Sequence, residues 1–488
     1  MNSKKSYKII LIKLIYTFSA FVVLLSLTII AIAYNVSSLK ASMINQNTLT
    51  WAEETRLRAL NPDYYRLASI EISLPDTPPP VVLSPQLYNS IEKFGPKNNN
   101  SLYKYIIITL MRPSRITNVN SSLNRITDEN YLTKFIEINK PLIEEINTTY
   151  EKPFKRDKFI DSSAEGIKIF MKNNNVTPGD CNVELCSDAA LTLTDIALQR
   201  KKINDALKCD IAVLRLSEIR KPGPKGLYYI GHCLFSENNL ALKLFIDNDD
   251  WLHDITNIES LKSALLKRIE FIKIFTGYPE LIKYSALCTN HLLKAFSLKD
   301  RITLESINLW YGDPNKIFYE ASRLLNLKPE MSFNEIQRIC RELNQKYPRP
   351  KSYNYVLAES GEGVESLFKF LLFVLKTHPL PEKFGNISEF DLEQFINIHT
   401  KLRLTTFGGL MRIFYAENKR WPDLEKDKEF IKTAGPAAID PYNNKFFEVI
   451  KSQTTETLLI KSEAKDYYDH KSKTTDNIKL YLKKPLGL

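Results

Sequence analysis

An uncharged, apolar segment near the N-terminus constrains this chain more than any other feature. Residues 14–34 read LIYTFSAFVVLLSLTIIAIAY, a run of 21 residues without a charge. A helix of that length spans a hydrocarbon core of about 30 Å. Four lysines precede the run, and the next charged residue after it is Lys40. Because lysines gather on the cytoplasmic side of membrane helices, we expect a transmembrane anchor with residues 1–13 in the cytoplasm.

A cleaved signal peptide is the alternative interpretation of this segment. Ala31, Ile32 and Ala33 resemble a cleavage site, and the lysines before residue 14 form a basic n-region. The apolar run is longer than the usual h-region of about 7–15 residues, which favours an uncleaved anchor. Both interpretations export the rest of the chain. The uncleaved anchor, which the length of the run favours, predicts a single-pass protein of the bacterial inner membrane, with its body in the periplasm.

The charge of the chain argues against nucleic acid as a partner. The 488 residues carry a net charge of +11, and the four N-terminal lysines leave +7 for residues 35–488. No block of five or more basic residues occurs, and no nucleic-acid-binding motif is present. A spread positive charge indicates a mild preference for anionic surfaces of the cell envelope.

Six cysteines in an exported chain predict disulfide bonds. Cys181 and Cys186 enclose only four residues, so their loop has the lowest closure cost of any pair. Cys209 and Cys233 are favoured as a second pair, which would clasp the loop at residues 221–226. The other two cysteines are left open between a disulfide bond and buried thiols.

The hydrophobic pattern predicts a mainly α-helical chain with a small α+β tail. Residues 35–101 fit a juxtamembrane helix and a proline-rich connector, and residues 102–376 fit an irregular α-helical domain. Capping-box patterns at Thr256–Glu259 and Ser332–Glu335 mark the start of two of its helices. Residues 386–488 fit a helix followed by an antiparallel sheet.

That C-terminal tail has the clearest local signals. A helix is expected over residues 388–417, with Gly408 and Gly409 in its middle. Two adjacent glycines weaken a helix, and they indicate close packing against another element. Strands are expected where short β-rich runs follow, at residues 445–450, 457–461 and 477–482.

Part of the tail resembles the periplasmic segment of type II secretion pseudopilins. The similar residues are LMRIFYAENKRWP at 410–422 and DPYNNKFF at 440–447, within about 60 C-terminal residues. In that family a helix ends at a polar-aromatic-Pro turn, and an Asp-Pro turn leads into a β-meander. The resemblance therefore implies a helix packed on a small antiparallel sheet.

The chain departs from pseudopilins in its length. More than 350 residues separate the apolar segment from this tail, and no pseudopilin processing site precedes Leu14. Filament polymerisation is therefore not implied. The whole chain, with NPDYY at residues 61–65, resembles uncharacterised envelope proteins of proteobacteria, a group that implies no activity.

One acidic cluster is the candidate for chemistry. Asp247 and Asp249 follow an apolar run, and hard cations such as Mg²⁺ and Mn²⁺ bind carboxylates in that arrangement. His253 and His232 lie in the same span, so Asp249 and His253 are the candidate catalytic residues. The alternative is a polar turn in which Asp249 or Asp250 caps the next helix. Alternating βαβ segments of a nucleotide-binding domain are absent, so no cofactor and no bound metal are expected.

The sequence thus favours a non-catalytic role in the envelope, as a scaffold or as a partner of a secretion or assembly machine. We expect a protein partner, together with the membrane through residues 14–34. The alternative is a membrane-tethered enzyme that acts on envelope glycans with a divalent metal at Asp247 and Asp249. No common hydrolase motif is present, which leaves the question of catalysis open.

Overall fold

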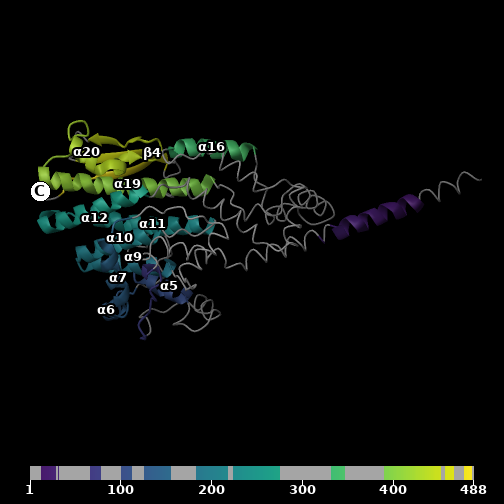
Figure 1. The fold of residues 1–488 in the computed structure, drawn as a ribbon, viewed down its shortest axis with the longest axis horizontal. Coiled ribbons are helices and arrows are strands. Elements are labelled where there is room, and N and C mark those ends of the chain that lie inside the picture. The colour runs from purple at the N-terminus through teal and green to yellow at the C-terminus, as the bar shows by residue number, and fades with distance from the viewer. Residues whose placement is uncertain are drawn as a thin grey trace, which may run out of the picture.

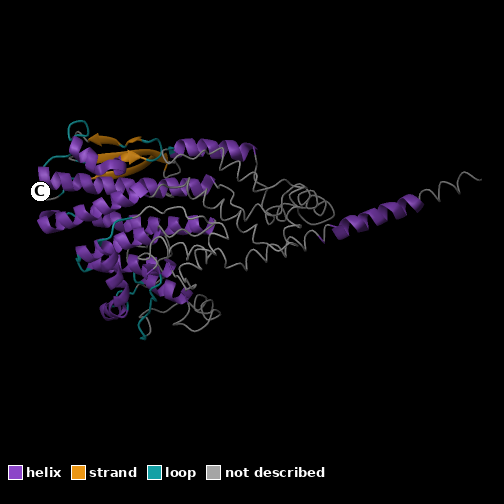
Figure 2. Ribbon diagram, in the orientation of Figure 1, coloured by secondary structure: helices purple, strands orange, loops and turns teal. Residues whose placement is uncertain are grey.

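The computed structural model describes part of the chain. The described residues are 12–28, 31, 66–77, 101–112, 126–154, 183–217, 224–274, 331–346, 389–451, 457–465 and 477–485. Within them the chain is mainly helical, and small antiparallel sheets lie near the C-terminus (Figures 1 and 2). The prediction of a mainly α protein with a sheet in its tail is confirmed.

The predicted membrane anchor is wrong. In the part of the chain that the structure describes, no helix is both long and apolar enough to cross a membrane. The single-pass topology of residues 14–34, the membrane as a partner and the inner-membrane location are therefore not supported.

Helix α10 is the centre of the helical body. The helices before and around it are α5 (Ser101–Leu110), α6 (Glu129–Ile138), α7 (Lys140–Tyr150), α9 (Val183–Gln199) and α10 (Ile203–Ser217). α10 packs against α7, α9, α11 (Pro224–Phe245) and α12 (Ile255–Ile274). Most of its residues are buried, including Asp210 and Arg215. A helix surrounded on all sides must bury its polar residues as well, so these need partners on neighbouring helices.

Side-chain caps fix the start of the smaller helices. Asp128 caps α6 by accepting a hydrogen bond of 2.7 Å from the Tyr131 backbone amide. Asn139, at the junction of α6 and α7, exchanges two hydrogen bonds with the backbone of Ser73. This asparagine thereby ties residues 66–77 to the two helices.

The later helices are α11 (Pro224–Phe245), η3 (Asp250–His253), α12 (Ile255–Ile274), α16 (Phe333–Lys346) and α19 (Glu389–Asn418). The capping box at α16 is confirmed, because the Ser332 hydroxyl accepts from the Glu335 amide and the Glu335 carboxylate accepts from the Ser332 amide. The box predicted for α12 is wrong. Asp254 caps α12 instead, accepting from the Thr256 amide at 2.8 Å.

The two glycines of α19 lie where the helix is packed on two sides. A Cβ atom on Gly408 would lie 2.6 Å from Leu480 Cδ2, in the sheet. A Cβ atom on Gly409 would lie 3.0 Å from Leu265 Cδ2 on α12 and 3.1 Å from Phe245 Cβ on α11. The prediction of close packing at this pair is confirmed. α19 therefore lies between the other helices and the sheet (Figure 2).

The C-terminal sheet lies on α19 as the sequence predicts. After α20 (Lys428–Ala434) and η4 (Gly435–Ala438) come β1 (Ile439–Asp440), β2 (Lys445–Phe446), β3 (Glu448–Lys451), β4 (Leu458–Lys465) and β5 (Asn477–Leu482). β1 and β2 form a hairpin, and β3, β4 and β5 form an antiparallel meander in that order. Phe447 packs on Phe407 of α19, whereas Phe446 is exposed.

Asp440 organises the turn that leads into the meander. Its buried carboxylate accepts hydrogen bonds from the Tyr442 amide, the Ser462 hydroxyl and the Glu463 amide, at 2.8–3.0 Å. The carbonyls of Pro441 and Tyr442 then accept from the first amides of α16. The predicted Asp-Pro turn is confirmed, and it joins the sheet to a helix far back in the sequence.

The glycine pair gives a first prediction. Gly409→Ala should lower the free energy of unfolding by up to about 2 kcal/mol, because overpacking a core costs about 1–3 kcal/mol and the better helix propensity of alanine offsets about 1 kcal/mol. Asn418→Ala, at the exposed end of the same helix, should change it by less than about 0.5 kcal/mol. Urea unfolding followed by circular dichroism measures both. A raised midpoint for Gly409→Ala would refute the close contact, because the helix propensity of alanine would then act without an opposing cost.

Candidate functional site

A fully buried arginine joins four helices in the middle of the body. The Arg268 guanidinium on α12 donates to Asp210 of α10 at 2.9 Å and to Glu237 of α11. Its Nε donates to the Thr406 hydroxyl of α19 at 3.2 Å, and its plane lies 5.2 Å from the Phe245 ring. The two carboxylates and the guanidinium are at most 1% exposed.

The buried network holds one proton at neutral pH. Two carboxylates face one guanidinium, so full ionisation would leave a net negative charge away from water. Burial raises the pKa of Glu237 from 4.5 to about 8, against the opposing effect of Arg268, and the nearby Asp210 raises it further. The same two carboxylates raise the pKa of Arg268 although burial lowers it. The neutral Glu237 side chain leaves a balanced pair of Asp210 and Arg268.

A second buried arginine engages the predicted acidic cluster. Arg412 of α19 donates to the Asp249 carboxylate and to the carbonyl oxygens of Phe245 and Ile246. Asp247 lies at the surface, and the desolvation of its carboxyl raises its pKa while Arg412 lowers it. Both carboxylates therefore face a cation supplied by the protein. This arrangement holds the end of α11 on α19, and it competes with metal binding at these residues.

The other predicted site residues lie apart from any metal-binding arrangement. Asp249 sits at the N-cap position of η3 but makes no side-chain cap, and His253 ends that turn with an exposed side chain. Asp250 pairs with Lys201 across 3.8 Å on the surface. His232 lies on α11, outside the described side chains. Among the described residues, no group of three or more histidine, cysteine or acidic side chains is placed to hold a metal ion.

The predicted disulfide bonds are wrong for the cysteines that the structure describes. Cys186, Cys209 and Cys233 are buried and none forms a disulfide bond. The Cys186 thiol lies 3.4 Å from the carbonyl oxygen of Ile70, as a weak donor. Burial raises the pKa of Cys209 to about 12, with Asp205 and Asp210 adding to the effect. These thiols serve as small apolar groups in the core. Cys181 lies outside the described residues.

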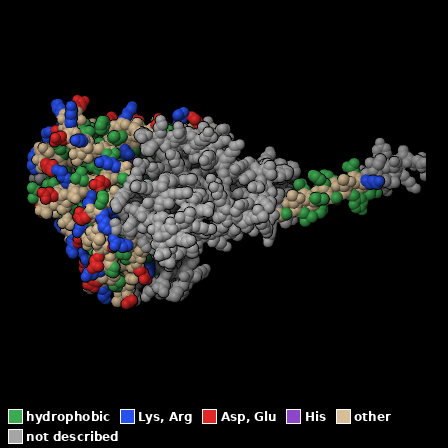
Figure 3. Space-filling model, viewed as in Figure 1, with side chains coloured by type: hydrophobic (Ala, Val, Ile, Leu, Met, Phe, Trp, Pro, Cys, Tyr) green, Lys and Arg blue, Asp and Glu red, His purple; other side chains and the backbone are tan. Residues whose placement is uncertain are grey.

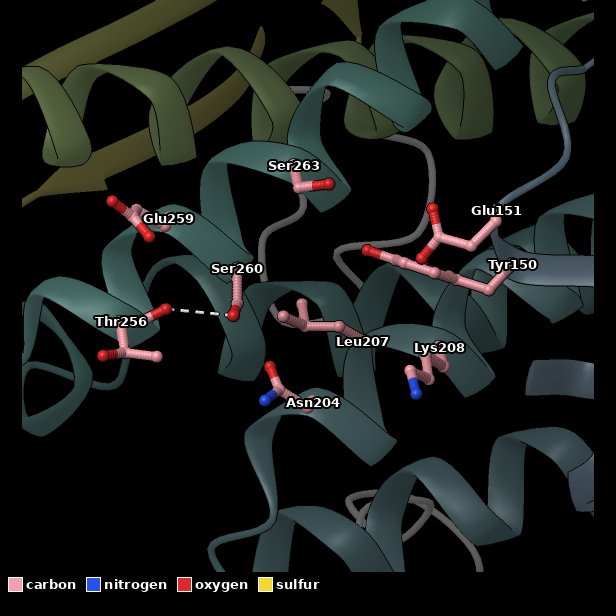
Figure 4. A pocket seen from close by; sticks show the side chains of 9 residues that line it. All are labelled: Tyr150, Glu151, Asn204, Leu207, Lys208, Thr256, Glu259, Ser260 and Ser263. Atoms are coloured by element: carbon pink, nitrogen blue, oxygen red, sulfur yellow. Dashed lines mark hydrogen bonds between the residues drawn. The ribbon is translucent and has the colours of Figure 1, made fainter. Parts of the chain in front are cut away.

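A pocket opens between the end of α7 and the first turns of α10 and α12 (Figure 4). Its volume is about 340 Å³. Its base is formed by Tyr150, which is 9% exposed, and by the buried Leu207. The remaining lining residues are polar, and they are Glu151, Asn204, Lys208, Thr256, Glu259, Ser260 and Ser263. No cysteine or histidine lines it, so it offers no paired nucleophile and imidazole base.

The outer face of the meander carries an exposed apolar row. Ile450 on β3, Leu459 on β4 and Tyr481 on β5 are cross-strand neighbours in register. Ile450 is 41% exposed and Tyr481 60% exposed. The adjacent row on the same face consists of Glu448, Lys461 and Lys479. Elsewhere on the face drawn in Figure 3, basic and acidic side chains are interspersed.

Comparison with known proteins finds no relative of this chain. No protein-family model, no curated protein sequence and no solved structure matches it. The resemblance to pseudopilins therefore stays a prediction that rests on the C-terminal residues.

Sequence reasoning missed Arg268 and Arg412. The apolar face of α12 contains Leu265 and Ile272, and Arg268 falls on the same face by helical spacing. A charged residue inside an apolar stripe was the available signal. Its partners are 31, 58 and 138 residues away in sequence, which no local pattern reveals.

The proton on Glu237 gives a second prediction. The folded state keeps this proton to a higher pH than the unfolded chain, so its stabilisation is complete below about pH 4.5 and is lost as the pH rises through about 8. The wild type should therefore lose up to about 1.4 kcal/mol per pH unit relative to Glu237→Gln between those values. Urea unfolding of both proteins from pH 5 to 9 measures this difference. A difference independent of pH would contradict the bound proton.

A third prediction tests whether Asp249 forms an ion pair with Arg412 or binds a metal ion. Asp249→Ala should lower the free energy of unfolding by about 1–3 kcal/mol, because the buried Arg412 loses a charged hydrogen-bond partner. The loss should be the same with EDTA and with added MnCl₂. Asp250→Ala is the matched control, since its exposed pair with Lys201 contributes at most about 1 kcal/mol. Stabilisation of the wild type alone by Mn²⁺ would restore the metal hypothesis.

Proposed function

We propose that this chain is a non-catalytic, partner-binding component of a protein assembly, and that the outer face of β3, β4 and β5 is its contact surface. The observation that carries the proposal is the apolar row in which the partly buried Leu459 lies between the exposed Ile450 and Tyr481. Exposed aromatic and aliphatic side chains in one row are typical of interface centres, where tyrosine is enriched. The inner face of the same sheet is rigidly packed on α19, which presents the row in a fixed geometry.

The charged side chains beside the apolar row indicate which charges the partner should carry. Lys461 pairs with Glu448 across 3.3 Å. Lys479 on β5 and Lys483, just after that strand, are exposed. An apolar row with lysines on both sides fits a folded protein whose own apolar patch is bordered by carboxylates. The resemblance of this tail to a secretion pseudopilin supports the same place for the contact, and it suggests a secretion or assembly machine as the setting.

The described ionisable groups support binding rather than catalysis. Asp210 and Glu237 are fully buried around Arg268, and Asp249 is paired with Arg412. A catalytic carboxylate must reach a substrate, whereas these groups connect helices to one another. Their arrangement makes a rigid body, which suits a scaffold.

The fourth prediction tests this contact surface. In gentle extracts of cells that express it, the wild-type chain should migrate as a complex larger than its own 56.4 kDa. Tyr481→Asp should weaken the complex by about 30-fold or more, because loss of an interface anchor costs about 2 kcal/mol or more. Size-exclusion chromatography with quantitative mass spectrometry of the co-eluting protein measures the shift to the monomer.

Matched controls make the test specific. Ile450→Asp should act like Tyr481→Asp, whereas Leu266→Asp on α12, which is also 41% exposed, should leave the complex intact. The melting temperatures of the purified variants should stay within a few degrees of the wild type. A wild-type chain that is monomeric in the extract, or a sheet variant that keeps the complex, would overturn the proposal.

A further inference from the structure

The polar pocket at the start of α10 and α12 is a second surface that the proposed assembly role does not use. We propose that it binds a neutral, hydroxyl-rich ligand, namely a sugar ring of a saccharide. Its volume of about 340 Å³ is near the lower end of the range of about 300–1,000 Å³ for small-molecule sites. Such a pocket has room for one sugar ring, while the rest of a longer saccharide would extend into solvent.

The base of the pocket is a built polar site. Tyr150 is 9% exposed, and its hydroxyl points from the end of α7 toward α12 (Figure 4). The Lys267 ammonium lies 4.8 Å from the centroid of the Tyr150 ring and covers one of its faces. Because little of the ring is exposed, it offers a ligand almost no stacking surface.

The walls of the pocket offer both donors and acceptors. Thr256 and Ser260 come from the first turns of α12, and Asn204 comes from the first turn of α10 (Figure 4). The Ser260 hydroxyl donates to the Thr256 carbonyl at 2.9 Å, which leaves its lone pairs as acceptors. A carboxamide and hydroxyls in one pocket match a ligand whose own groups both donate and accept.

Charge and polarity exclude the other ligand classes. Glu151 and Glu259 are offset by Lys208, which also lines the pocket, and by Lys267, which lies 3.9 Å from Glu151. The site is thus nearly neutral, and no arginine lines it to clamp a phosphate or a carboxylate. Leu207 is its one aliphatic lining residue, so an apolar ligand would bury little surface.

Burial keeps Tyr150 in its donor form. Desolvation raises the pKa of the Tyr150 phenol, the nearby Ser263 lowers it, and Glu151 and Asp210 raise it further. The phenol is therefore protonated throughout the physiological range and can donate to a sugar oxygen. Because the contacts are hydrogen bonds without stacking, we expect weak binding, with a Kd of about 1 mM.

The fifth prediction tests this site with the full chain and defined probes. Saturation-transfer difference NMR should detect binding of maltose or of N,N′-diacetylchitobiose, but not of glucuronate or benzyl alcohol. Asn204→Leu and Ser260→Leu should each weaken saccharide binding by about 10-fold, the effect of losing hydrogen bonds worth about 1.4 kcal/mol. Both positions are partly or fully exposed, so the variants should fold.

Thr148→Leu is the matched control, because Thr148 is exposed on α7 and does not line the pocket. It should bind saccharide as the wild type does. Two results would overturn the inference. One is no signal from either neutral disaccharide at about 10 mM, ten times the expected Kd. The other is saccharide binding that both pocket variants retain. Neither result concerns the complex formed through the sheet. A failure of the saccharide test would therefore leave the proposed contact surface unaffected.

Discussion

One guanidinium holds the helical body together. Arg268 reaches Asp210, Glu237 and Thr406, so a side chain of α12 is bonded to α10, α11 and α19 at a single point. Burying a charge costs several kcal/mol unless it is paired, and an unpaired partner left behind is more costly still. The rotation of each helix about its axis, and its position along that axis, are therefore limited to those at which its own polar group meets Arg268. Apolar packing alone would tolerate several such arrangements, whereas the buried charges select one.

α19 connects the helical body to the C-terminal sheet. Its glycine pair lets α12 and the sheet approach from opposite sides, and Arg412 fixes the end of α11 on the same helix. The two proposed surfaces therefore belong to one rigid frame. The meander lies on one side of α19 and α12 on the other (Figure 1), and the polar pocket lies between α7, α10 and α12. A partner and a saccharide bound at these places would not compete for the same residues.

Two sequence predictions failed because they judged residues by composition without their surroundings. The apolar run at residues 14–34 has the length of a membrane span, but no helix among the described residues is both long and apolar enough to cross a membrane. An even number of cysteines suggested disulfide bonds, yet Cys186, Cys209 and Cys233 are buried thiols. Cysteine packs as a small apolar residue in either case, so its count says little about its oxidation state.

The sequence by itself determined the local structure of the tail. Strong local signals sufficed for α19, its glycine pair, the Asp440 turn and the strands, because alternation, capping and turn chemistry act over a few residues. The Ser332 cap is of the same kind. Only the tertiary structure decided the roles of Arg268, Glu237 and Arg412, since their partners lie between 31 and 167 residues away. It also decided that Asp249 forms an ion pair with Arg412. A buried charge is defined by what surrounds it, and that surrounding exists only after the chain has folded.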